Sequence, residues 1–203
     1  NYISLNSIDF PLVTTIGKYA FCGCTNLTRV NFPSVTSVGD SAFQFCTNLI
    51  NVDFPLATID ISHAFYGCTS LTNVNFPLVT RIGGYTFQDC TNLTNINLPL
   101  VTSIGAYAFK SCTNLTRIDL PSATVITSKA FSGCANLKTI ILRANTVVKL
   151  DNLNAFEGTP ISNFAGYIYV PQALMSDYSV ATNWTNFEGF FREIEIYEAE
   201  GII

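Results

Sequence analysis

Residues Val101 to Ser122 read VTSIGAYAFKSCTNLTRIDLPS, and this stretch indicates the fold because it recurs along the chain. Six such units of 22 residues occupy positions 13–144, and the second half of a further unit occupies positions 1–12. A fixed period of this length is typical of solenoids, in which each repeat forms one coil and packs on its neighbours. The sequence therefore predicts a repeat solenoid.

Two positions of the unit carry the same apolar residue in all six copies. A residue that stays apolar at every turn points inward and stacks on its counterpart in the next coil. We expect these two columns to form the core. They are Phe21, Phe43, Phe65, Phe87, Phe109 and Phe131, and Leu27, Leu49, Leu71, Leu93, Leu115 and Leu137.

The end of each unit carries the signals of a short strand. Val30-Asn31-Phe32 alternates in polarity as strands do, and Pro33 follows at once, where it stops the hydrogen-bonding ladder. Gly17 and its equivalents indicate a turn that needs either a positive φ or a close backbone approach. A unit of this length, interrupted by glycine and proline, leaves no room for a long helix. The fold is therefore expected to be mainly β.

The repeat resembles the BspA-like leucine-rich repeats of bacterial surface proteins. Their pattern has Ile-Gly, Ala-Phe, Cys and Leu-x-x-Ile-x-Leu-Pro at these spacings. The tail at residues 166–188 is similar to the closing segment of such arrays. The resemblance implies a right-handed solenoid with a parallel sheet on its concave face, little helix, and a role in adhesion at the cell surface.

The regular register ends after Ala144, because the next Ala-Phe pair is displaced by three residues to Ala155 and Phe156. We therefore divide the chain into a solenoid at residues 1–165, with an irregular last coil at 145–165, and a small α/β capping segment at 166–203. The cap is predicted to contain a strand at 166–170, a helix starting at Pro171 and a second strand at 191–197. Its aromatic residues are expected to cover the apolar end of the solenoid.

Composition excludes several classes of protein. The chain has 48% hydrophobic and 12% charged residues, which argues against disorder, and its net charge of -4 argues against nucleic-acid binding. It contains no run of 18 apolar residues, so we expect no transmembrane segment. The first ten residues lack the features of a signal peptide, and we expect an export signal to have been removed or to lie upstream. The resemblance implies an extracellular or cell-surface location, and we expect a monomer.

Six cysteines form a column with a period of 22 residues, and Cys22 lies outside it. Stacked side chains point the same way, so buried thiols are favoured over disulfides, and Cys22 is expected to be the exposed, reactive thiol. Such a column does not supply a tetrahedral zinc site, and we expect no metal or cofactor. His63 is expected to be a packing residue of the outer turn. No nucleophile arrangement can be built around it, so we expect no enzyme activity.

The exposed side of the predicted sheet is the candidate binding surface. Arginines interrupt its amides, and aspartates add acceptors of opposite charge. Its partner is expected to be an extracellular protein or glycan, such as a host matrix protein. Two alternatives stay open: the stacked amides bond to one another and only keep the sheet soluble, or the chain is a passive spacer that displays another domain. The candidate residues are Arg29, Asn31, Asn51, Asp53, Asn73, Asn75, Asn95, Asn97, Arg117 and Asp119, with Thr139 and Ile141 at the next outward positions.

Overall fold

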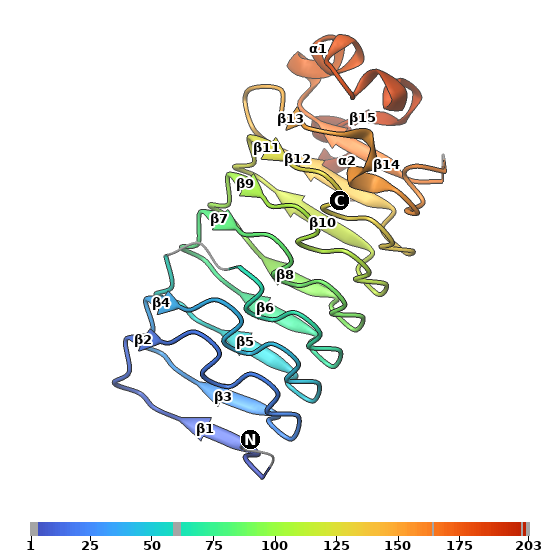
Figure 1. The fold of residues 1–203 in the computed structure, drawn as a ribbon. Coiled ribbons are helices and arrows are strands. Elements are labelled where there is room, and N and C mark those ends of the chain that lie inside the picture. The colour runs from blue at the N-terminus through green and yellow to red at the C-terminus, as the bar shows by residue number, and fades with distance from the viewer. Residues whose placement is uncertain (1–3, 59–61, 164, 200, 202–203) are drawn as a thin grey trace.

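The computed structural model describes residues 4–58, 62–163, 165–199 and 201. The coils stack along one axis from the N-terminal to the C-terminal end (Figure 1). Strand pairing is parallel, and Ser7 on the first strand pairs with Arg29 on the next, which confirms the 22-residue register. The coils contribute the following strands to one face: β1 (Ser7–Asp9), β3 (Arg29–Asn31), β5 (Asn51–Asp53), β6 (Asn73–Asn75), β8 (Asn95–Asn97), β10 (Arg117–Leu120) and β12 (Thr139–Leu142).

This face consists of two parallel sheets. The first has the order β1-β3-β5-β6-β8, and the second has the order β10-β12-β14-β15. The last two strands are β14 (Tyr167–Val170) and β15 (Phe191–Glu193), so the chain after residue 165 continues the sheet of the solenoid. The division of the chain at that residue stays a prediction.

A second row of two-residue strands runs along the other side of the coils. This second row was not predicted from the sequence. These strands are β2 (Thr15–Ile16), β4 (Ser37–Val38), β7 (Arg81–Ile82), β9 (Ser103–Ile104), β11 (Val125–Ile126) and β13 (Lys149–Leu150). Next to this row, a Cβ added at Gly39 would lie 2.5 Å from the backbone nitrogen of Lys18, and one at Gly105 would lie 2.6 Å from the Gly83 carbonyl carbon. Close backbone approach is therefore the reason for glycine at these two positions.

The core consists of stacked rings and thiols. Phe87 is fully buried, and its ring centroid lies 5.6 Å from that of Phe65 and 5.3 Å from that of Phe109. The Sγ of Cys112 donates a hydrogen bond to the backbone oxygen of Phe87 at 3.1 Å, and other coils repeat this contact. All seven cysteines are free, Cys22 is exposed and the six others are buried, as predicted.

The C-terminal segment covers the last coil. Trp184 is buried, its ring centroid lies 6.0 Å from that of Phe156, and its indole nitrogen donates to the Val148 carbonyl. This segment and the end of the last coil contain the helices of the described chain. They are the 3₁₀ helices η1 (Leu153–Phe156), η2 (Gln172–Leu174) and η3 (Thr185–Phe190), and the α-helices α1 (Met175–Val180) and α2 (Ile194–Ala199).

Two expectations about this region are wrong. The strand predicted at 191–197 ends at Glu193, and α2 begins at the next residue. Ile194 and Tyr197 lie one turn apart on α2 and pack against Ile141 and Tyr169 on the outward face of the sheet. Ile141, which was expected to be exposed, is therefore buried. The short apolar face of α2 is covered by this contact, which explains why the alternating sequence forms a helix there.

Candidate functional site

The ten predicted residues lie on one face of the sheet, as the strand pattern requires. Each of the strands β3, β5, β6, β8 and β10 presents its first and third residues outward, with the residue between them turned towards the core. Eight of the ten are exposed, whereas Asn75 and Asp119 are half-buried. The first row is Arg29, Asn51, Asn73, Asn95 and Arg117. The second row is Asn31, Asp53, Asn75, Asn97 and Asp119, and Asp9 on β1 precedes it.

The asparagines of the first row form a ladder across three coils. Asn73 Nδ2 donates to Asn51 Oδ1 at 2.7 Å, and Asn95 Nδ2 donates to Asn73 Oδ1 at 2.9 Å. The hydroxyl oxygens of Thr72 and Thr94 also accept from the amides that follow them in sequence. The stacked amides thus form hydrogen bonds with one another, which is the first half of the alternative that these amides only keep the sheet soluble.

The second row has the same hydrogen bonds, and its aspartates set their direction. Asn31 donates to Asp9 at 2.9 Å, Asn75 donates to Asp53 at 2.9 Å, and Asn97 donates to Asn75 at 2.8 Å. A carboxylate only accepts hydrogen bonds, so each amide after it turns its Nδ2 back towards the previous coil. Each Oδ1 therefore points towards the following coil.

This direction leaves acceptors facing acceptors at two places. The Oδ1 of Asn31 faces the coil that carries Asp53, and the Oδ1 of Asn97 faces the coil that carries Asp119. The backbone ladder is interrupted at the same places: β3 and β5 share only the pair Arg29 and Asn51, and β8 and β10 belong to different sheets. Two acceptors cannot form a hydrogen bond, so side-chain support is missing where the strands separate.

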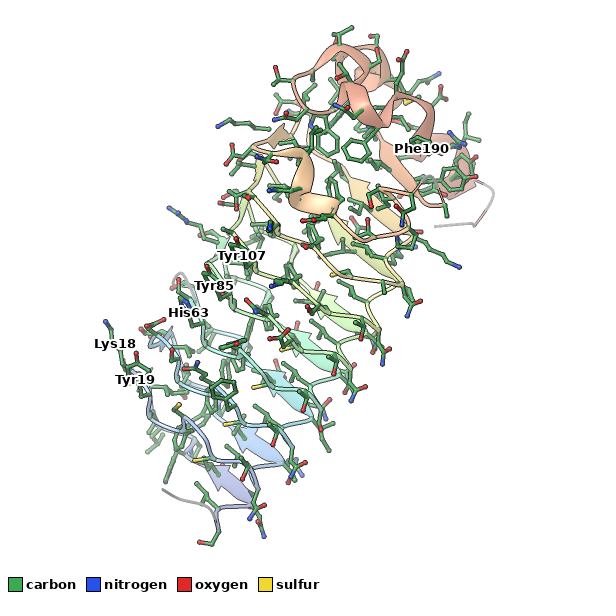
Figure 2. The ribbon with its side chains drawn as sticks, turned by 45° about the vertical axis from the view of Figure 1, so that its right-hand side comes forward. Lys18, Tyr19, His63, Tyr85, Tyr107 and Phe190 are labelled. Carbon is green, nitrogen blue, oxygen red and sulfur yellow. The ribbon has the colours of Figure 1, made fainter. Side chains whose placement is uncertain are left out.

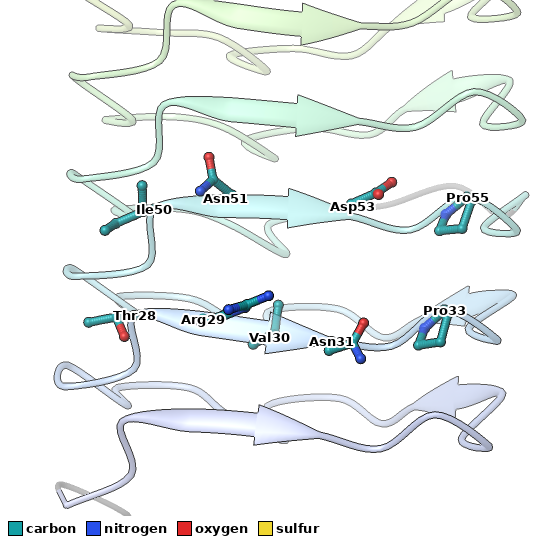
Figure 3. Close-up of a pocket in the computed structure, with 9 residues that line it drawn as sticks. All are labelled: Thr28, Arg29, Val30, Asn31, Pro33, Ile50, Asn51, Asp53 and Pro55. Atoms are coloured by element: carbon teal, nitrogen blue, oxygen red, sulfur yellow. The ribbon is translucent and has the colours of Figure 1, made fainter.

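The strand face is hollowed at both interruptions. A hollow of about 530 Å³ lies between β3 and β5, and Figure 3 shows its lining. A second, shallow hollow of about 560 Å³ extends along the strip from β5 to β10. Neither is lined by an aromatic residue. The first hollow is lined by Thr28, Arg29, Val30, Asn31, Pro33, Ile50, Asn51, Asp53 and Pro55.

Asp119 is already bound within the chain. Arg143 Nε and Nη2 donate to its two carboxylate oxygens at 3.0 to 3.1 Å, and Arg143 also pairs with Glu198 of α2. The hydrogen bonds to Asp119 raise the pKa of Arg143 above its ordinary value. The pair of Arg143 and Asp119 was not predicted from the sequence. A signal was present, because Arg143 occupies the repeat position held by Pro121 and the earlier prolines.

Partly exposed rings form a separate row on the outer turns (Figure 2). The ring of His63 stacks on that of Tyr85 at 4.8 Å, and Tyr85 stacks on Tyr107 at the same distance. His63 Nδ1 lies 3.2 Å from a carboxylate oxygen of Asp40. His63 is thus a packing residue of the outer turn, as expected.

The described residues contain no group of three or more His, Cys, Asp or Glu side chains that could hold a metal ion. None of the helices in the described part of the chain is long and apolar enough to cross a membrane.

Comparison with solved structures finds bacterial leucine-rich repeat proteins. A leucine-rich repeat protein from T. pallidum is 29% identical with a TM-score of 0.71, and the match covers 85% of this chain and 81% of that one. One from Bacteroides ovatus is 27% identical with a TM-score of 0.61, covering 94% of this chain and 54% of that one. A leucine-rich cell surface protein from Faecalibacterium prausnitzii is 26% identical with a TM-score of 0.52, covering 82% and 60%. This chain thus spans little more than half of the latter two proteins.

No curated protein matches this chain significantly. Residues 1–78 and 61–167 match the BspA type leucine-rich repeat region, in six copies. The repeat period, the parallel strands and the similar solved structures agree with this match. The chain belongs to the BspA-type leucine-rich repeat family.

Proposed function

We propose that the chain is a non-catalytic interaction module at the cell surface, and that it binds an extracellular protein or glycan through the outward face of β3, β5, β6, β8 and β10. The observation that carries this proposal is that the face is open there, whereas α2 covers it from β12 onward. Repeat proteins commonly bind through extended surfaces of this kind. The similar Faecalibacterium prausnitzii protein is a cell surface protein, which supports the proposed location.

The ladders make this face a rigid surface. Each amide in the middle of the strip has fixed partners on both sides, so little side-chain entropy is lost when a ligand binds. The same ladders favour a second candidate function, a passive spacer, because much of the hydrogen-bonding capacity is used internally. Arg29 and Arg117 are the exposed cations of the first row, and a binding function depends on them more than on the paired amides.

A binding screen against glycans and extracellular matrix proteins tests the proposal. For any ligand found, a variant with alanine at all five positions of the first row should lose binding while it keeps its urea midpoint within about 1 M, since exposed substitutions cost little each. A variant with Lys18→Ala and Arg81→Ala removes the same number of positive charges at exposed positions outside this face. It should bind as the unmodified protein does. Equal affinity of both variants would place the binding site outside this face, on the outer turns around Tyr19, Tyr85 and Tyr107 or on the cap, and would favour a spacer role for the sheet.

A further inference from the structure

We propose that the hollow between β3 and β5 is a subsite for a carboxylated sugar, such as the hexuronate unit of an extracellular glycan. This inference rests on the proposed function and specifies the ligand class for one part of the strip. It follows from the polar groups at the two ends of the hollow. One end presents hydrogen-bond acceptors, and the other presents hydrogen-bond donors.

The acceptor end is formed by Asn31 and Asp53. Asn31 uses its Nδ2 to bind Asp9, so its Oδ1 points towards β5, as Figure 3 shows. Asp53 accepts from Asn75 on its other side and has no donor on β3 among the described residues. In the neighbouring coils the backbone nitrogen of the next phenylalanine also bonds across the gap, as Phe54 does to the oxygen of Asn75. Among the described hydrogen bonds, the equivalent bond from the backbone nitrogen of Phe32 to the oxygen of Asp53 is missing. The acceptors at this end of the hollow can therefore accept from a bound donor, such as a hydroxyl group.

The donor end is formed by Arg29 and Asn51. The Oδ1 of Asn51 accepts from Asn73 at 2.7 Å, so its Nδ2 is directed back towards β3 (Figure 3). Arg29 stands opposite it in the strand register. Within the described part of the chain, Arg29 has no carboxylate at ion-pair distance. A guanidinium group and an amide nitrogen side by side bind a carboxylate, and the charge makes such hydrogen bonds the stronger kind.

The spacing of the two ends fits one sugar ring. They lie two residues apart along the strand, which is about 7 Å at the usual rise per residue. A hexuronate carries its carboxylate on one side of the ring and hydroxyl groups on the opposite side, so one ring can contact both ends. Pro33, Pro55 and Ile50 line the hollow and can pack against the C–H groups of the ring.

The second interruption of the ladder shows what such an acceptor end binds. There, Asp119 receives two donors from the chain's own Arg143. The position of Arg143 relative to Asp119 corresponds to Pro77 relative to Asp53, and proline has no side-chain donor. The chain thus satisfies one interruption itself and leaves the other open to a ligand.

Asp53→Asn is the decisive variant. Its new amide can accept from Asn75 and donate to Asn31, which would join the two parts of the second row into one ladder. The fold should therefore keep or raise its urea midpoint while the acceptor end is lost. Arg29→Asn extends the first-row ladder in the same way and removes the cation. Asp177→Asn and Lys18→Asn are the matched controls, with the same charge changes at exposed positions outside this hollow and outside the two rows of candidate residues.

Calorimetric titration with a hyaluronan tetrasaccharide, and with the same tetrasaccharide after reduction of its carboxylates to alcohols, tests the inference. We expect the acidic form to bind at least tenfold more tightly than the reduced form. We also expect Asp53→Asn and Arg29→Asn each to weaken binding at least tenfold, with both controls unchanged. No binding of the acidic form, equal binding of the two forms, or equal losses in the controls would overturn the inference. A protein ligand that is found in the screen and lost in the five-site variant would then leave the proposed function standing without this subsite.

Discussion

Replacing Phe87 by alanine tests the stacked core directly. Phe87 is fully buried, and its ring lies between those of Phe65 and Phe109 at interplanar angles of 6° and 17°. Replacing a buried phenylalanine by alanine lowers the free energy of unfolding by about 3 to 5 kcal/mol, including the cost of the cavity that remains. The coils on both sides are held by strand pairs and cannot collapse into the cavity. We therefore expect a loss at the upper end of that range, about 4 to 5 kcal/mol.

Phe156→Ala is the informative comparison. From the irregular sequence of the last coil, a smaller loss is expected there. The structure instead shows Phe156 fully buried, with Phe131, Trp184 and Phe187 around it at 5.6 to 6.0 Å. We now expect a loss comparable to that of Phe87→Ala, concentrated in the contact between the cap and the last coil.

Urea melts with two probes distinguish the variants. Trp184 is the only tryptophan, so its fluorescence reports the cap, whereas far-UV circular dichroism reports the sheets. Phe156→Ala should shift the fluorescence transition to lower urea than the dichroism transition, and Phe87→Ala should shift both. Phe45, whose side chain is 44% exposed, is the control, and its replacement by alanine should cost less than half as much. Small and equal losses in all three variants would refute the stacked core.

Three further predictions concern the turns, the thiols and the cap. Ser111 has φ = 60° at a turn position where three other coils have glycine, so its backbone is strained. Ser111→Gly should therefore raise the free energy of unfolding by about 0.5 to 1 kcal/mol in a urea melt, and a lower urea midpoint would contradict this strain. Without reductant, a thiol reagent should label only Cys22 in the folded protein and all seven cysteines in denaturant, as mass spectrometry can measure. The six cysteines of the column are buried, and burial raises the pKa of Cys46 to about 12, so its thiol is both inaccessible and protonated in the folded state. Burial also raises the pKa of Tyr178 to about 12, so this tyrosine favours the folded state at lower pH, and that contribution is lost as the pH rises from about 10 through 12. Tyrosinate absorbance should show a late step near pH 12, and Tyr178→Phe should remove that step.

The period and the core could be predicted from the sequence because both depend on columns that repeat in every unit. Phe87 and Cys112 are buried for the same reason in every coil, and one column is enough to show it. The two-residue strands such as β9 could not be predicted, because a pair of residues carries no periodicity. The helix α2 was also missed, since its sequence alternates like a strand and only its packing on Ile141 decides between the two.

The chemistry of the candidate site depends on a relation between coils that no single repeat displays. Asp53 in the sequence indicates only a charge among amides. In the structure it is the acceptor that fixes the orientation of Asn75 and, through it, of Asn97. The same carboxylate cannot donate a hydrogen bond to Asn31. The ladder from Asp9 to Asn31 therefore ends at Asp53, and the ladder through Asn75 and Asn97 begins there. Once the 22-residue register is known, each Asn followed by an Asp in the second row predicts an interruption. Whether that interruption is open depends on a further residue, Arg143 in one case and Pro77 in the other, which lies 24 positions downstream of each aspartate.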